Sequence, residues 1–355
     1  MRKSLLYILL ILLILLSACM DDGNRLKESF SAQNGVLVLC NGNFMSGNSS
    51  LTFYRSDSMF AEQNVFFRAN AIPLGDVAQS ISIHNNKAWI NVNNSGKTIA
   101  VNPENFVAIG KIDSLVSPRY YFPVNDVKAY ISDLYAQRIW IIDLINYSII
   151  GNIDIGIESD GFNRHCAEQM VAWGKYVFTN CWNYDNKILV VDTQDDALVD
   201  SITVGLQPQK IIADISGKIW VLCDGAYSGS PIGNESPSIW CIDAETQNIL
   251  WSQSISIETI SFDIALSPGA DTLYVVAGNL YSMPTSATEF PQEAALESNG
   301  RNFSAIGVHP LSGDIYLADA GNYVQSGQVY RFDRFLTPID TFNCGIIPID
   351  FAFID

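Results

Sequence analysis

The sequence is poor in the residues that most often carry catalysis or bind nucleic acids. Its 355 residues include 3 histidines, and 20 Lys and Arg stand against 37 Asp and Glu, for a net charge of −17. Such an acidic chain is repelled by a phosphate backbone and by anionic lipid head groups, which disfavours a nucleic-acid partner and membrane docking by charge. The sequence has no G-x-S-x-G motif, no P-loop and no C-x-x-C pair. The usual signals of a hydrolase, a nucleotide-binding enzyme and a zinc ribbon are therefore missing.

The one long apolar run stands at the N-terminus, where Leu5–Leu16 follows the basic Arg2 and Lys3. A bilayer span needs roughly 20 residues, so this run is typical of a signal peptide. The letters "LSAC", ending at Cys19, resemble a lipobox, which implies a signal peptide over 1–18, a lipidated Cys19 and a polar tether over 19–33. The alternative is an ordinary signal peptide with a chance cysteine. The next residues, "MDDG", resemble the acidic export signal of Bacteroidetes surface lipoproteins, which implies an outer-membrane anchor facing the cell exterior.

No segment shows a long 3.6-residue period, so helices are expected to be nearly absent. Seven segments instead align with one another, each polar at its start, strand-forming in the middle and ending in Asn, Asp, Gly or an aromatic residue. They begin at Gly35, Lys87, Lys128, Lys175, Lys218, Thr272 and Asp314. Further strand-like stretches precede and follow each segment, and units of four strands at a period of about 40 to 54 residues indicate propeller blades. The predicted fold is an all-β, seven-bladed propeller of four-stranded blades over residues 34–355.

The end of the chain predicts how the ring closes. The first unit lacks an inner strand of its own, whereas one extra strand, "IIPIDFAFID", follows the last unit. Its "IPID" corresponds to the "QPQK" that precedes Lys218. We therefore expect the C-terminal strand to supply the inner strand of blade one, which removes an open sheet edge. The alternatives are a loose tail or a strand added to an unclosed sandwich.

Six of the 7 cysteines follow Cys19, and export makes disulfides possible. A hairpin turn at Trp173–Gly174 would place Cys166 opposite Cys181 on adjacent strands, so this pair is the disulfide candidate. The other four are left open between disulfides and buried thiols: Cys40, Cys223, Cys241 and Cys344.

The three histidines do not predict a metal centre. His84 and His309 are expected at the far ends of two inner strands, whereas His165 lies near the start of another, on the opposite face of the disc. One catalytic metal cluster cannot include all three. Acidic residues occur in every turn of a propeller, so paired carboxylates carry little information. We therefore expect no catalytic residues, no metal and no cofactor, and a binding protein rather than an enzyme.

The loops after the seven aligned segments all open on one face, and they combine aromatic residues with Asn and Gly. The inner strands begin at the same face with further polar residues, Gln209 among them, and rigid rings beside amides suit a large, neutral ligand bearing amides or resembling a sugar. Any single tyrosine has packing between blades as its alternative role. The candidate ligand-binding residues are Asn43, Phe44, Arg119, Tyr120, Tyr135, His165, Glu168, Trp182, Tyr184, Gln207, Tyr227, Asp263, Asn322 and Tyr323.

The stretches "SPRYYFPVNDVKAYISDLYAQRIWIID", "EQMV", "NCWNYDNKILVVDT", "LQPQKIIAD" and "SGKIWVLCDG" resemble the YncE-like propeller lipoproteins of Bacteroidetes, and within them the cobalamin-binding BtuG type. The resemblance covers the whole mature chain. It implies that cobalamin or a related corrinoid is bound as cargo, without a resident cofactor, and is passed to a TonB-dependent outer-membrane transporter. His165 would then approach the cobalt, donate a hydrogen bond or pack as a ring. A glycan-binding or adhesive propeller is the alternative function, and a propeller lyase is a third.

Overall fold

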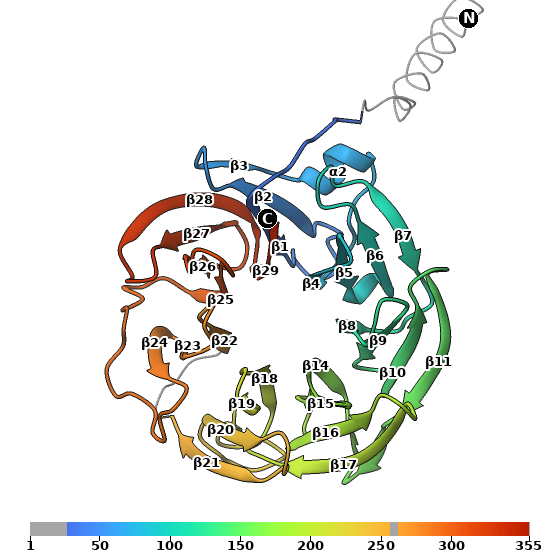
Figure 1. Ribbon diagram of the computed structural model, residues 1–355, viewed down its shortest axis with the longest axis vertical. Helices are drawn as coiled ribbons and strands as arrows, with labels where there is room; N and C mark the ends of the chain where they lie inside the picture. The colour runs from blue at the N-terminus through green and yellow to red at the C-terminus, as the bar shows by residue number, and fades with distance from the viewer. Residues whose placement is uncertain (1–26, 256–261, 355) are drawn as a thin grey trace, which may run out of the picture.

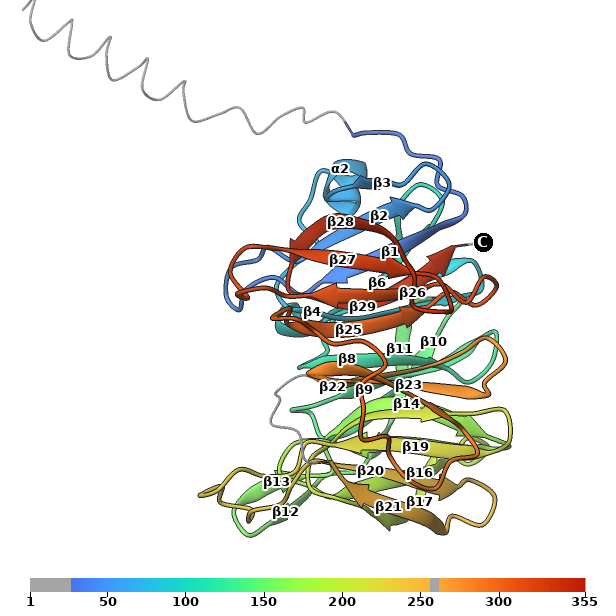
Figure 2. The ribbon, with the colours of Figure 1, turned by 90° about the vertical axis from the view of Figure 1, so that its left-hand side faces the viewer.

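The computed structural model describes residues 27–255 and 262–354. Seven sheets are arranged around a central channel, as the sequence repeats predict (Figure 1). In the side view, the blades lie next to one another around a flat disc (Figure 2). The predictions for residues 1–26, including the signal peptide and the lipidated Cys19, lie outside the described residues.

Blades two to five each contain four consecutive antiparallel strands, with the innermost strand first. They comprise β4 (Ala78–His84), β5 (Lys87–Val92), β6 (Lys97–Val101) and β7 (Ala108–Ile112); β8 (Pro118–Pro123), β9 (Lys128–Asp133), β10 (Arg138–Asp143) and β11 (Ser148–Asp154); β14 (Ala167–Trp173), β15 (Tyr176–Cys181), β16 (Lys187–Asp192) and β17 (Ala197–Thr203); and β18 (Pro208–Ala213), β19 (Lys218–Cys223), β20 (Ser238–Asp243) and β21 (Ile249–Ser254). A separate hairpin of β12 (Ile157–Ser159) and β13 (Phe162–Arg164) joins blades three and four.

Blade six departs from the four-strand prediction. Its sheet holds β22 (Phe262–Leu266), β23 (Thr272–Ala277) and β24 (Asn279–Pro284), so the described residues supply three strands there. Only an isolated bridge between Leu280 and Leu296 continues the pairing outward. Blade seven has the full set: β25 (Phe303–Val308), β26 (Ile315–Asp319), β27 (Ser326–Phe332) and β28 (Pro338–Ile346).

Blade one confirms the predicted closure. Its sheet has the order β29-β1-β2-β3, so the C-terminal strand β29 (Pro348–Ile354) is the inner strand beside β1 (Gly35–Cys40), β2 (Ser50–Arg55) and β3 (Phe60–Glu62). Gly35 pairs with Ile354 at one end of the ladder, and Cys40 pairs with Pro348 at the other. The Pro208–Cys223 pair has the same place in blade five, as the match of "IPID" to "QPQK" predicts.

The core lies between the blades, because each sheet buries both of its faces. In β1 all six residues are buried. Leu37 and Leu39 belong to the apolar cluster shared with blade two, whereas Val36 and Val38 belong to the cluster shared with blade seven. Alternate side chains of a strand point to opposite faces, so one apolar strand supplies two interfaces.

Helix is scarce, as the missing helical period predicts. The described residues contain one α-helix, α2 (Val65–Asn70), and one 3₁₀ turn, η1 (Asn93–Ser95). The last part of the expected tether is packed beside α2, because Ala32 is buried and the Phe30 ring lies 5.1 Å from Phe106. Arg68 of α2 also pairs with Glu28. The propeller therefore holds the chain from about residue 28, and no described helix is long and apolar enough to cross a membrane.

The predicted disulfide is not formed. Cys166 and Cys181 are both free and buried, and Cys181 pairs with Ala167 rather than with Cys166. Trp173 pairs with Tyr176, so the turn falls one residue later than the predicted Trp173–Gly174, and the register shift between Ala167 and Met170 only partly offsets this difference. Among the described residues, the other four cysteines are also free, buried thiols.

Candidate functional site

A β-bulge recurs where six of the inner strands begin. In blade five the register shifts between Pro208 and Lys210, so Gln209 is the extra residue of the bulge on β18. A bulge inserts an extra residue and re-aims its side chain. Equivalent shifts occur in blades one, two, three, four and seven. The residues at the position of Gln209 are Gln79, Arg119, Glu168, Ser304 and Ile349.

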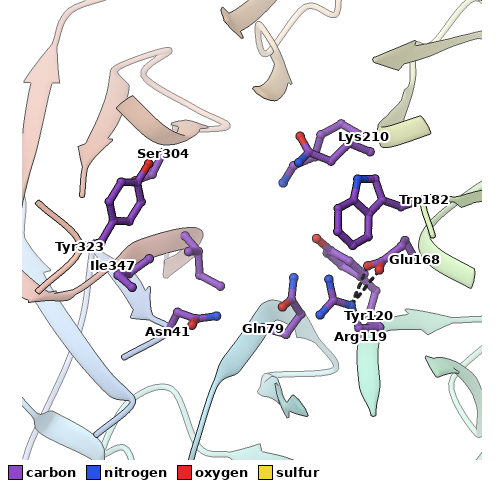
Figure 3. A pocket seen from close by; sticks show the side chains of 12 residues that line it. Asn41, Gln79, Arg119, Tyr120, Glu168, Trp182, Lys210, Ser304, Tyr323 and Ile347 are labelled. Atoms are coloured by element: carbon purple, nitrogen blue, oxygen red, sulfur yellow. Dashed lines mark hydrogen bonds and ion pairs between the residues drawn. The ribbon is translucent and has the colours of Figure 1, made fainter. Parts of the chain in front are cut away.

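These bulge residues line a pocket of about 290 Å³ at one mouth of the central channel (Figure 3). The polar and charged side chains come mainly from blades two to five, whereas blades seven and one contribute a more apolar side. Figure 3 shows Tyr323 and Ile347 facing Lys210, Trp182 and Arg119 across the opening. The full lining is Asn41, Gln79, Arg119, Tyr120, Glu168, Trp182, Gln209, Lys210, Ser304, Tyr323, Ile347 and Ile349.

Arg119 and Glu168 form a buried ion pair in the pocket. Arg119 Nε lies 2.9 Å from Glu168 Oε1 and 2.8 Å from Oε2, and the Glu168 side chain is only 4% exposed. Burial raises the pKa of the Glu168 carboxyl above its usual value, and the Arg119 charge and hydrogen bonds oppose that rise. The two residues come from neighbouring blades, so the pair also ties β8 to β14.

Lys210 lies one position deeper in the channel than the bulge residues. Its Nζ lies 3.1 Å from Asp263 Oδ1, and both side chains are largely buried. The Asp350 carboxyl interacts with the Lys210 charge, but burial dominates and raises the pKa of Asp350 to about 7. The Lys210 cation of the pocket lining therefore interacts with two carboxyl groups, those of Asp263 and Asp350.

Side chains at this deeper position join neighbouring inner strands. Three of them, those of Asp350, Gln169 and Asp263, each accept a hydrogen bond from a main-chain N–H of the next blade. The bonds run from Ile81 N to Asp350 Oδ2 (2.8 Å), from Ile211 N to Gln169 Oε1 (3.0 Å) and from Ile306 N to Asp263 Oδ2 (2.9 Å). Because inner strands do not pair with one another, these bonds stabilise the wall under the pocket.

Trp182 forms one wall of the pocket, directly after β15. Its Nε1 donates a hydrogen bond of 2.7 Å to Asp224 Oδ2 in the corresponding loop of blade five. Burial raises the pKa of Asp224 to about 6, and the Trp182 hydrogen bond opposes that rise. The bond fixes the indole orientation without using its face, which stays available to a ligand.

Five of the fourteen predicted site residues line the pocket: Arg119, Tyr120, Glu168, Trp182 and Tyr323. Three others support its surroundings without lining it. Asp263 pairs with Lys210, Asn43 Nδ2 donates to the Tyr323 carbonyl oxygen at 2.7 Å, and Gln207 Nε2 donates to the Gly225 carbonyl oxygen at 2.9 Å.

The remaining six predicted residues lie in the surrounding loops of the same face. Phe44, Tyr135 and Tyr227 are 69%, 69% and 73% exposed, so they form a rim of aromatic side chains rather than packing between blades. The other three contact residues nearby. The Tyr184 ring packs on Phe162 with 4.7 Å between ring centres, and Asn322 Oδ1 accepts hydrogen bonds from the main-chain N–H groups of Val324 and Gln325. The main-chain N–H of His165 donates to Asp185, and its Nδ1 contacts the Ile155 carbonyl oxygen.

The sequence prediction omitted Asn41, Gln79, Lys210, Ser304, Ile347 and Ile349, which also line the pocket. A signal was present, because the second residue of each inner strand repeats the position of Arg119, Glu168 and Gln209. His84 and His309 lie at the other ends of β4 and β25, as expected. Within residues 27–255 and 262–354, no group of three or more His, Cys, Asp or Glu side chains is arranged to hold a metal.

Comparison with known proteins gives a family and a fold. The family model described as "Domain of unknown function (DUF5074)" matches residues 34–343. No curated protein matches the chain. A quinoprotein alcohol dehydrogenase-like protein from Bacteroides thetaiotaomicron is similar at a TM-score of 0.68 and 15% identity, covering 92% of this chain and 79% of that one.

Two other solved structures show the same architecture. A protein from Lactobacillus plantarum has a TM-score of 0.67 at 10% identity, with 91% of this chain and 100% of that chain covered. The periplasmic gluconolactonase PpgL from Pseudomonas aeruginosa has a TM-score of 0.61 at 11% identity, with 91% and 99% covered. At these identities the likeness shows the propeller fold and carries no activity with it.

Proposed function

This chain belongs to the family described as domain of unknown function DUF5074, and we propose that it is a surface lipoprotein that binds cobalamin or a related corrinoid. The bound corrinoid is passed to a TonB-dependent outer-membrane transporter, and the chain itself performs no chemistry on it. The ligand is cargo rather than a cofactor. The resemblance to the BtuG type supplies the ligand class and the transporter.

One observation carries the proposal: the polar pocket at the channel mouth lies within a rim of exposed aromatic side chains. Its volume of about 290 Å³ is at the lower limit for a drug-sized ligand. A corrinoid is larger than this, so its ring system lies over the mouth and one substituent enters. Phe44, Tyr135 and Tyr227 offer exposed rings to a conjugated macrocycle, and the pocket offers hydrogen bonds to its amides.

The N-terminus supports placement at the membrane. Small residues before Cys19 and the acidic "MDDG" fit lipidation followed by export to the outer leaflet, and two or more acyl chains give stable anchoring. The chain joins the propeller beside α2, at the outer edge of blades one and two (Figure 1). An anchor attached there leaves the channel mouth open to ligand.

A glycan is the second candidate ligand, and the wall of the pocket favours it. The Trp182 indole and the planar polar groups of Arg119 and Gln79 line the same pocket of about 290 Å³ (Figure 3). Aromatic faces beside hydrogen-bonding side chains suit a sugar ring as well as a corrinoid amide.

Titration of the protein with cyanocobalamin tests the proposal, with the visible spectrum and the heat of binding as readouts. Wild type should bind, and Trp182→Ala should lose at least about 2 kcal/mol if the indole is an anchor. His309→Ala, on the opposite face, should bind like wild type. No binding by wild type would reject the corrinoid and favour the glycan, and equal losses in both variants would place the site elsewhere.

A further inference from the structure

The two cationic side chains of the pocket, Arg119 and Lys210, have more hydrogen-bond donors than their carboxylate partners use. Among the contacts made by residues 27–255 and 262–354, Arg119 uses only its Nε, with Glu168. Its two Nη groups point into the pocket beside Gln79 (Figure 3). Lys210 Nζ has three N–H donors, one of which is directed at Asp263. The side chains of Arg119 and Lys210 are 16% and 15% exposed, and both line the pocket.

The carboxylates are placed differently, because each is buried and already accepts hydrogen bonds. Glu168 accepts from Arg119, and Asp224 accepts from Trp182. Asp263 and Asp350 accept main-chain N–H groups of the next blade. A ligand in this pocket therefore meets donors first, and it needs an oxygen that accepts hydrogen bonds.

The charge around the pocket decides which acceptor is suitable. Two cations, Arg119 and Lys210, face four carboxyl groups within one buried region, so the cations are already outnumbered. Burial keeps the pKa of Asp350 near 7 and that of Asp224 near 6, which indicates that ionising all four is costly. A further anion would add to this repulsion, whereas a neutral carbonyl oxygen would not.

A carboxamide also needs an acceptor for its own N–H groups, and the pocket supplies one. Asn41 Nδ2 donates to the Ala78 carbonyl oxygen at 3.1 Å, which directs the other end of the same amide away from that bond. Gln79 lies opposite Asn41 and next to Arg119 (Figure 3). Side-chain amide oxygens accept hydrogen bonds, and Asn41 and Gln79 line the same pocket as Arg119 and Trp182.

We propose that the pocket binds a neutral, planar primary carboxamide, with its carbonyl oxygen on Arg119 and Lys210 and its nitrogen towards Asn41 and Gln79. The inference deepens the proposed function and rests on it for the identity of the whole ligand, of which the carboxamide is one substituent. The group against which it discriminates is the carboxylate of the same shape.

Nicotinamide and nicotinate form the matched probe pair, because they share a ring and differ in the amide and the carboxylate. Each is titrated at pH 8 while the Trp182 indole Nε1–H resonance is followed by NMR, with Trp182→Phe used to assign it. Nicotinamide should shift the resonance and bind at least about tenfold more tightly than nicotinate, a difference of about 1.4 kcal/mol. Arg119→Lys, which keeps the charge but loses the planar fork, should weaken nicotinamide several-fold.

Arg138→Lys is the control, since Arg138 belongs to the same blade but does not line the pocket. Nicotinate binding as tightly as nicotinamide would overturn the preference for a neutral group. Failure of nicotinamide to shift the resonance, or equal losses in the two arginine variants, would overturn the carboxamide site. The cyanocobalamin titration tests the proposed function separately. If the protein binds nicotinamide but not cyanocobalamin, the carboxamide site is kept and the corrinoid is rejected.

Discussion

Replacing Phe351 by alanine tests whether the closing strand is an integral part of the ring. Phe351 lies on β29, is buried, and belongs to the apolar cluster between blades one and seven. Its ring centre lies 6.2 Å from that of Tyr316 on blade seven. Deleting a buried phenylalanine side chain removes its transfer free energy and leaves a cavity, at a cost of about 3–5 kcal/mol. Since domains are stable by only about 5–15 kcal/mol, the loss should be large.

Chemical unfolding followed by circular dichroism measures this loss, with Phe335→Ala as the matched control. Phe335 lies between β27 and β28 of blade seven and is 74% exposed. The same deletion there should therefore change the free energy of unfolding by no more than about 0.5 kcal/mol. Equal stabilities of Phe351→Ala and Phe335→Ala would refute the reasoning, because the C-terminal strand would then not be packed into the ring.

Three further predictions concern backbone approach, pH and anchoring. Gly307→Ala should lower the melting temperature clearly more than Gly269→Ala. A methyl group at position 307 would lie 2.8 Å from Phe351 Cβ, whereas at position 269 the nearest atom is 3.7 Å away. Equal melting temperatures would contradict the close contact at Gly307. Burial raises the pKa of Asp350 from 3.8 to about 7, so the folded state binds the proton more tightly and this group's contribution to stability falls as the pH rises from about 4 to about 7. Asp350→Asn should therefore flatten the stability profile between about pH 4 and pH 7, and an unchanged slope would show that Asp350 is not the titrating group. Cys19→Ser should abolish incorporation of labelled palmitate, and continued labelling would remove the lipobox interpretation.

The fold could be predicted because the same residue types recur at the second strand of every blade. The polar start, strand core and Asn, Asp or Gly end recur at each second strand, and the described structure has β1, β5, β9, β15, β19, β23 and β26 at those places. Closure followed from counting strands and from the match of Pro348 to Pro208. Blade six was mispredicted, because its outer segment continues the pairing only through the Leu280–Leu296 bridge.

The site was predicted in part, because neither the bulges nor the position of one hairpin turn could be predicted from the strand pattern. A bulge at the start of an inner strand turns its second residue into the channel, so Gln79 and Ser304 face the pocket although neither is aromatic or in a loop. The disulfide was mispredicted because Trp173 pairs with Tyr176, so the turn falls one residue later than Trp173–Gly174, and Cys181 lies opposite Ala167 rather than Cys166. Alternation along a strand fixes sides only where the pairing is regular.

The most direct test of the account is a crystal structure of the protein with cyanocobalamin. The account predicts the macrocycle over the channel mouth, within the rim of Phe44, Tyr135 and Tyr227, with one amide in the pocket at hydrogen-bond distance from Arg119 Nη. Density for the ligand on the face that carries His84 and His309, or an empty pocket beneath a ligand held only by the rim, would contradict it.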